Sequence, residues 1–83
     1  MHKAPDRFWK YLDSLAPDVQ SLARKNFEIL KDNPAHPSLQ FKKVGKFWSA
    51  RVGLDHRALA VEAEHGFTWV WIGSHDEYSR LIG

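Results

Sequence analysis

The apolar periodicity of the chain changes once, at residues 33–38, and this change constrains the fold more than any other feature. The segment reads NPAHPS, and two prolines so close together favour a stiff turn. Before it, apolar residues recur at helical spacing, and after it they alternate as in strands. Length adds a second constraint, because 83 residues can build one hydrophobic core but not two. We therefore expect a single α+β domain spanning residues 1–83.

Two helices are expected in the first half. Phe8, Leu12 and Leu15 recur at the i, i+4 and i+7 positions of one apolar helix face. A second apolar stripe begins after Pro17, which suits a first helical turn, and ends before Pro34, which disfavours helical geometry at the residue preceding it. The connection near residue 16 is very short, so the two helices are predicted to form an antiparallel hairpin.

The second half predicts strands at residues 39–44, 48–52, 56–62 and 67–72, separated by short turns. Consecutive strands joined by tight turns form an antiparallel meander. The predicted fold is therefore α+β, with an N-terminal helical hairpin packed on one face of a small antiparallel β-sheet.

Positive charge is concentrated in the middle of the chain. The net charge is only +2, yet between residues 39 and 60 a single acid, Asp55, faces five basic residues: Lys42, Lys43, Lys46, Arg51 and Arg57. Such a field attracts polyanions, nucleic acid above all. The plain alternative is a solvated basic surface without a partner.

Strand alternation predicts where the two arginines lie. If Trp48, Ala50 and Val52 pack against the helices, Ser49 and Arg51 point to the opposite face of the sheet. Arg57 begins the next strand, across a short turn from Arg51. We expect a basic pair on an open sheet surface, with Lys42 or Lys43 contributing from the neighbouring strand.

A polar cluster, SHDEY at residues 74–78, follows the last strand. Its histidine, His75, is of the residue type that accepts or donates a proton near neutral pH. The alternative is that Asp76 caps a C-terminal helical turn through residue 81, which leaves His75 and Tyr78 as exposed side chains.

Several other classes of site are not indicated. The chain has no cysteine, no H-E-x-x-H motif and no glycine-rich phosphate loop, and its five histidines fall in separate segments. We therefore expect no metal and no cofactor. The four tryptophans could stack bases, although core positions are the plainer expectation. No apolar run is long enough to cross a bilayer and no secretory signal is visible, so a cytoplasmic protein without a membrane partner is expected.

The order of these motifs resembles a known family. Residues 48–61, WSARVGLDHRALAV, and residues 71–81, WIGSHDEYSRL, are similar to segments of the RelE/ParE superfamily of toxins from bacterial type II toxin–antitoxin systems. The asparagine–proline pair at 33–34 also fits, and the resemblance covers essentially the whole chain. It implies a RelE-like fold and a cognate antitoxin protein as partner.

The resemblance also implies a chemistry. RelE-type toxins inhibit translation as mRNA interferases: these endoribonucleases cleave mRNA on the ribosome without a metal, the substrate 2′-OH attacking the adjacent phosphate. By position, the resemblance assigns catalytic roles to Arg51, Arg57, His75 and Tyr78. The RNA-binding residues expected with them are Lys42, Lys43 and Lys46.

This chain departs from the RelE pattern at one position, and some alternatives stay open. Ser49 stands where RelE has a lysine, and Lys43 is a possible substitute from the previous strand. His75 and Glu77 are both candidates for the general base. The alternative function is binding without catalysis, either as a ParE-like gyrase inhibitor or as an inactive relative that only binds antitoxin.

Overall fold

The computed structural model describes residues 2–82. It has five strands, three α-helices and one 3-10 turn, in the order β1 (His2–Lys3), α1 (Asp6–Asp13), α2 (Pro17–Asp32), η1 (Pro37–Leu39), β2 (Lys42–Val44), β3 (Phe47–Val52), β4 (His56–Ala63), β5 (Gly66–Ser74) and α3 (His75–Ile82). The α+β class is confirmed, and α2 begins at Pro17 and ends before Pro34, as predicted. β2 is shorter than expected, because Pro37 begins a tight turn instead of a strand.

The sheet is mixed rather than wholly antiparallel, which corrects the prediction. Its strand order is β1-β5-β4-β3-β2, and every neighbouring pair is antiparallel except β1 and β5. In that parallel pair, His2 lies opposite Phe67 and Lys3 opposite Thr68. Two residues are too few to show an alternating pattern in the sequence. β1 is recognised as a strand only from its pairing with β5.

The predicted helical hairpin is not confirmed, because each helix packs on its own part of the sheet. Helix α1 packs mainly on β5, and α2 packs on β3. Since α1 follows β1 after two residues, and β1 is hydrogen-bonded to β5, the start of the chain fixes α1 over β5. Strand β4 lies between β3 and β5, so the two helices pack on different strands. No helix within residues 2–82 is long and apolar enough to span a membrane.

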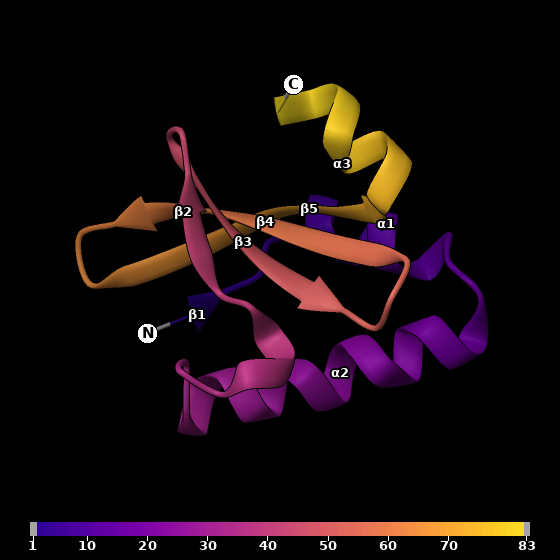
Figure 1. The fold of residues 1–83 in the computed structure, drawn as a ribbon, viewed down its shortest axis with the longest axis horizontal. Coiled ribbons are helices and arrows are strands. Elements are labelled where there is room, and N and C mark those ends of the chain that lie inside the picture. The colour runs from indigo at the N-terminus through magenta and orange to yellow at the C-terminus, as the bar shows by residue number, and fades with distance from the viewer. Residues whose placement is uncertain (1, 83) are drawn as a thin grey trace.

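Two layers cover the sheet (Figure 1). Figure 1 shows α2 running beneath the strands and α3 standing above them. The main core lies on the side of α1 and α2 and contains Phe8, Leu12, Leu30, Ala50, Val52, Ala58, Ala60, Trp69 and Ile72. Leu59 and Tyr78 are buried outside this cluster, where α3 packs on β4 and β5. The second layer is what creates the candidate site.

A β-bulge turns two tryptophans to opposite faces. Trp71 pairs with Leu59 and Trp69 pairs with Ala60, so β5 has one extra residue between consecutive residues of β4. In a regular strand these tryptophans, two positions apart, would share a face. The bulge places Trp69 in the main core and Trp71 on the side of α3.

Candidate functional site

Arg57 is the centre of the α3-covered face. Its guanidinium donates from Nη1 to Ser49 Oγ at 2.9 Å and from Nη2 to Gln40 Oε1 at 3.0 Å. The guanidinium carbon lies 5.1 Å from the centre of the Tyr78 ring, a cation–π distance. Arg57 is only 8% exposed, which corrects the expectation of an open sheet surface. Helix α3 covers it. The sequence predicts only a short C-terminal helical turn, and not a helix over this face of the sheet.

The charge of Arg57 is not neutralised by the residues around it. Both acceptors are neutral oxygens, and no carboxylate within residues 2–82 forms an ion pair with the guanidinium. A buried cation is costly unless hydrogen bonds or an opposite charge compensate it. Neutral acceptors hold the group in place without neutralising its positive charge.

Arg51 lies directly opposite Arg57 in the register of β3 and β4. Its Nε donates to the carbonyl of Gly53 at 2.8 Å, in the turn that follows β3. The two arginines thus share a face, as the alternation predicts, but only Arg57 is held by Ser49 and Gln40. Arg51 is half-buried and reaches toward the β3–β4 turn.

Helix α3 is fixed at its start by a capping box. The backbone N–H of Glu77 donates to Ser74 Oγ at 3.2 Å, while Glu77 Oε1 accepts from both the backbone N–H and the hydroxyl of Ser74. The expected cap, Asp76, is therefore wrong: Ser74 takes that role. The sequence contains the signal, because Ser-x-x-Glu is the capping-box spacing.

This cap also determines the state of Glu77. The hydrogen bonds from the backbone and then the side chain of Ser74 lower the pKa of the Glu77 carboxyl below its ordinary value. A carboxylate held ionised in a cap is a weak proton acceptor. Of the two candidate bases, His75 is the one whose ring takes no part in the cap.

Tyr78 and His75 take different positions on α3. Tyr78 is buried against Arg57, so the alternative that left it exposed is wrong. His75 is exposed, its backbone N–H donates to the Asp55 carbonyl at 2.7 Å, and its ring centre lies 5.9 Å from that of Tyr78. Arg57, Tyr78 and His75 therefore form a chain of contacts from the sheet to the surface.

The three lysines do not share one location. Lys42 pairs with Ser49 and so lies on the face of Arg57, whereas Lys43 pairs with Trp48 on the side of α1 and α2. Lys46 lies in the turn after β2, with its ammonium 5.5 Å from the Phe47 ring centre. The register thus makes Lys42 the candidate for the missing cation of β3, in place of Lys43.

Sequence reasoning missed Gln40 and the role of Ser49. Ser49 is fully buried, and its hydroxyl occupies the space where a longer cation was expected. Gln40 adopts a left-handed backbone conformation with φ 44°, which is uncommon for a residue other than glycine. It lies before β2 begins, so strand alternation does not predict its position.

One tryptophan lies on the same face. Trp71 is half-buried on the side of α3, and its ring occupies the space above Gly73, where any Cβ would overlap it. Gly73 pairs with Arg57. Among the described residues 2–82, no group of histidine, aspartate and glutamate side chains is arranged to hold a metal ion.

The fold is a mixed sheet with two separate helices on one face and, on the other, a short helix over a buried arginine. No protein-family model matches the sequence, and no curated protein matches it. Solved structures do match. The RelE toxin of a RelB–RelE antitoxin–toxin complex from Methanococcus jannaschii superposes with a TM-score of 0.74 at 12% identity, covering 98% of this chain and 99% of that chain.

A copper-bound mutant toxin from Helicobacter pylori superposes with a TM-score of 0.62 at 20% identity, covering 92% of this chain and 94% of that chain. Both alignments span nearly the whole fold. The resemblance to RelE-like toxins is therefore confirmed at the level of structure: the chain has the RelE-like toxin fold.

Proposed function

We propose that this chain is the toxin of a type II toxin–antitoxin system and acts as a metal-independent endoribonuclease on mRNA at the ribosome. The observation that carries the proposal is Arg57, a buried guanidinium bound only to neutral oxygens. An RNA phosphate gains negative charge as the 2′-oxygen attacks it, and a preorganised cation lowers that barrier. Both structural neighbours are toxins, and one of them was solved in complex with its antitoxin.

Each remaining group has a role in this reaction. His75 is the proton acceptor for the 2′-OH, because it is exposed beside Tyr78 while Glu77 is engaged in the helix cap. As the 2′-oxygen bonds to phosphorus, the bond to the 5′-oxygen breaks; the leaving oxygen takes up a proton from water, and His75 releases the proton it accepted to solvent. The products are a 2′,3′-cyclic phosphate and a free 5′-hydroxyl. Arg51 and Lys42 add positive charge along the same face.

Tyr78 is a positioning residue in this scheme. It contacts both Arg57 and His75, with 5.1 Å from its ring centre to the guanidinium carbon and 5.9 Å to the imidazole centre. Through these contacts it fixes the distance between the cation and the proton acceptor. The antitoxin partner and the cytoplasmic location belong to the same proposal.

Induced expression tests it. Cells would produce the native chain, Arg57→Ala or His75→Ala, and growth would be followed together with primer-extension mapping of mRNA ends. We expect growth arrest with new in-frame ends for the native chain and loss of both in each variant. His65→Ala is the matched control, because its turn lies at the opposite end of β4 and β5 from α3.

The other outcomes point elsewhere. Arrest without RNA cleavage would contradict the ribonuclease and favour a protein target such as gyrase. A chain that causes no arrest would have to act by binding an antitoxin alone. Circular dichroism of each purified variant separates loss of chemistry from loss of fold.

A further inference from the structure

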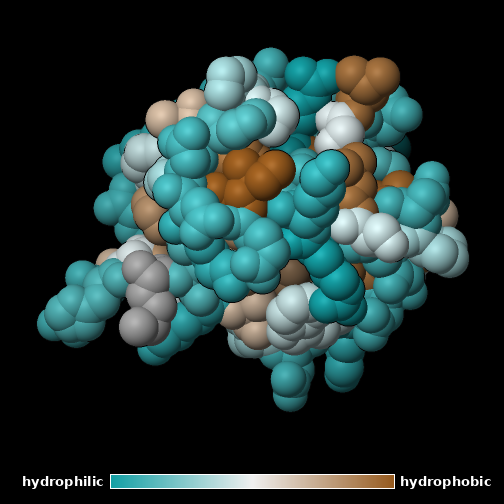
Figure 2. Space-filling model, turned by 90° about the horizontal axis from the view of Figure 1, so that it is seen from below, coloured by the Kyte–Doolittle hydropathy of each residue, from teal (hydrophilic) through white to brown (hydrophobic). Residues whose placement is uncertain are grey.

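Asn26 is a polar residue on the apolar face of α2. The buried residues of this helix are Ala23, Asn26 and Leu30, which recur at the i, i+3 and i+7 positions of one face. Asn26 is only 9% exposed and lines a hollow whose other walls include Phe8 and Trp69. Figure 2, seen from this side, shows an apolar hollow ringed by hydrophilic surface. A buried amide is costly unless it is hydrogen-bonded, and a leucine at this position would avoid that cost.

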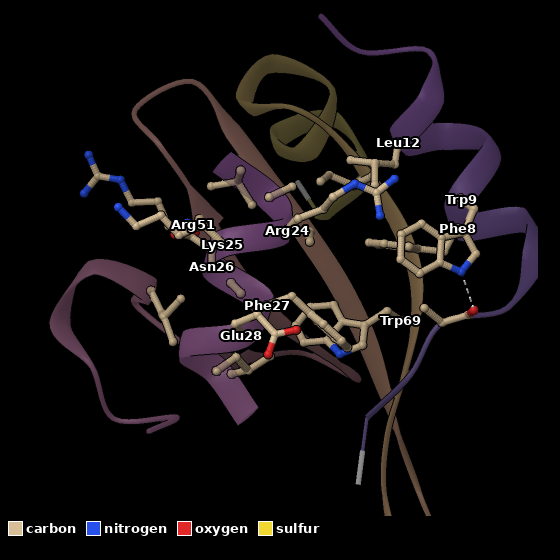
Figure 3. A pocket seen from close by; sticks show the side chains of 18 residues that line it. Phe8, Trp9, Leu12, Arg24, Lys25, Asn26, Phe27, Glu28, Arg51 and Trp69 are labelled. Carbon is tan, nitrogen blue, oxygen red and sulfur yellow. Dashed lines mark hydrogen bonds between the residues drawn. The ribbon is translucent and has the colours of Figure 1, made fainter. Parts of the chain in front are cut away.

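The amide of Asn26 is bonded to the strand that carries Arg51. Its Nδ2 donates to the backbone carbonyl of Arg51 at 3.2 Å, across 25 residues of sequence. Figure 3 shows Asn26 beside Arg51, whose side chain extends away from the hollow. Within residues 2–82, this is the one side-chain hydrogen bond between α2 and the sheet, because the amide of Gln20 donates instead to the carbonyls of Asp13 and Leu15. The Asn26 amide therefore attaches α2 to the end of β3.

The same helix also contacts the turn that follows β3. A Cβ at Gly53 would lie 2.8 Å from Cδ2 of Leu22, so the Leu22 side chain packs directly on this glycine. Gly53 has a φ of +66°, which glycine adopts without strain. Its carbonyl accepts the hydrogen bond from Arg51 Nε at 2.8 Å. Arg51 is thus held at two points: Asn26 binds its carbonyl, and the turn beneath Leu22 binds its guanidinium.

The other end of this turn supports His75. The backbone N–H of His75 donates to the Asp55 carbonyl at 2.7 Å. Residues 53–55 therefore bind the side chain of Arg51 at one end and the start of α3 at the other. The position of Arg51 relative to His75 depends on how this turn is held.

We propose that Asn26 is a positioning residue for the site on the opposite side of the sheet. It fixes the end of β3 and, through the adjoining turn, keeps Arg51 aligned with Arg57 and His75. Loss of the amide donor leaves the Arg51 charge in place but less firmly held, and a displaced charge stabilises a reacting phosphate less well. The consequence for RNA cleavage rests on the proposed function; the positioning of Arg51 does not.

Replacement of Asn26 by Leu tests the positioning directly. Leucine has the same branching as asparagine and suits apolar surroundings, but it cannot donate to the Arg51 carbonyl. The readout is hydrogen exchange of the Arg51 Nε–H in ¹H–¹⁵N NMR spectra, where the resonance is identified by its absence in Arg51→Lys. We expect exchange at least about fivefold faster in Asn26→Leu than in the native chain. Gln20→Leu makes the same kind of change on the same helix and is the matched control, with exchange at the native rate.

Cleavage of mRNA on programmed ribosomes is the second readout. We expect Asn26→Leu to lower the cleavage rate about tenfold, Arg51→Ala to lower it at least as much, and Gln20→Leu to leave it unchanged. Because Asn26 acts through Arg51, Asn26→Leu should have no further effect in an Arg51→Ala background. A general loss of stability would instead lower the rate equally in both backgrounds.

The inference is overturned if the Arg51 Nε–H exchanges at the native rate in Asn26→Leu. It is also overturned if, in an active chain, Asn26→Leu cleaves RNA at the native rate or its effect adds to that of Arg51→Ala. If Asn26→Leu does not fold, Asn26→Asp replaces it, because aspartate keeps the size of the side chain and cannot donate when ionised. Unfolding of both variants would confine Asn26 to a structural role and overturn the inference as well.

Failure of the proposed function gives a different result. If the native chain cleaves no RNA but the exchange of the Arg51 Nε–H changes as expected, the positioning by Asn26 stands and the ribonuclease does not. If the native chain cleaves RNA and Asn26→Leu matches it in both readouts, the ribonuclease stands and the positioning does not.

Discussion

Arg51 and Arg57 lie directly opposite each other across β3 and β4, yet their hydrogen bonds run in opposite directions along β3. Arg57 donates to Ser49, two residues before Arg51, and Arg51 donates to Gly53, two residues after it. Two like charges on adjacent strands repel, and this divergence separates them. It also leaves only Arg57 fixed beneath Tyr78, which is why the proposed chemistry depends on this arginine.

Replacement of Gln40 by Glu tests whether neutral acceptors matter. The new carboxylate would face Nη2 of Arg57, at the present distance of 3.0 Å, and neutralise it. We expect Gln40→Glu to raise the melting temperature but lower RNA cleavage, whereas Gln40→Ala lowers the melting temperature through loss of one hydrogen bond, about 1 kcal/mol. Calorimetry and primer extension provide the two readouts. Equal activity of Gln40→Glu and the native chain would contradict a role for the free charge.

The lysines at 42 and 43 form a natural pair of test and control. They are adjacent in sequence but lie on opposite faces of β2. We expect Lys42→Ala to lower the dependence of RNA affinity on salt, the slope of log K against log salt changing by about 0.7. Lys43→Ala should leave the slope unchanged. Binding to a single-stranded RNA, titrated at several salt concentrations, measures both; equal effects would place the RNA elsewhere.

Stability should fall as the solution becomes acidic, through His2. Its Nδ1 accepts a hydrogen bond from Trp69 Nε1 at 3.1 Å, so this nitrogen must be unprotonated. Burial, then the N-terminal charge and Lys31, lower the pKa of His2 below the ordinary value of 6.5. The unfolded chain therefore takes up the proton first as the pH falls.

The contribution of His2 is complete above about pH 6.5 and declines below it, by at most about 1.4 kcal/mol per pH unit. Urea denaturation of the native chain and of His2→Phe between pH 5 and pH 8, at roughly half-unit intervals, measures the difference. We expect the variant to have the shallower decline. An unchanged slope in His2→Phe would assign the pH dependence to other groups.

Gly73 is predicted to resist substitution because of Trp71. A Cβ at this position would overlap the six-membered ring of that tryptophan. We expect Gly73→Ala to lower the free energy of unfolding by about 1–3 kcal/mol. The cost should largely vanish in a Trp71→Ala background, since the overlapping ring is then absent. Chemical denaturation of the single and double variants forms a double-mutant cycle, and strict additivity would argue against the overlap.

What the sequence predicts well is what neighbouring residues encode. Helix α2 begins at Pro17 and ends just before Pro34, as expected, because proline acts on the backbone beside it. The alternation of β3 likewise places Ala50 and Val52 in the core. The Ser-x-x-Glu spacing at residues 74–77 is a local signal of the same kind for a capping box, although Asp76 was the expected cap.

Features that depend on distant segments were not predictable in this way. β1 pairs with the edge of β5 more than 60 residues later, and the bulge that separates Trp69 from Trp71 lies in the pairing of β5 with β4. The hairpin prediction failed for a similar reason, because α1 packs on β5 and α2 on β3, both distant in sequence. In the candidate site, Gln40 reaches Arg57 across 17 residues of sequence, a contact that no local pattern reveals.

The pairing of β1 with β5 delays the folding of the N-terminal segment during synthesis. His2 lies opposite Phe67 in the sheet. Until β5 has left the ribosome, β1 has no strand to pair with and α1 has no strand to pack on. At usual elongation rates the delay is roughly 3–13 s. The part of the fold that β1 and α1 build on β5 therefore forms only near the end of translation.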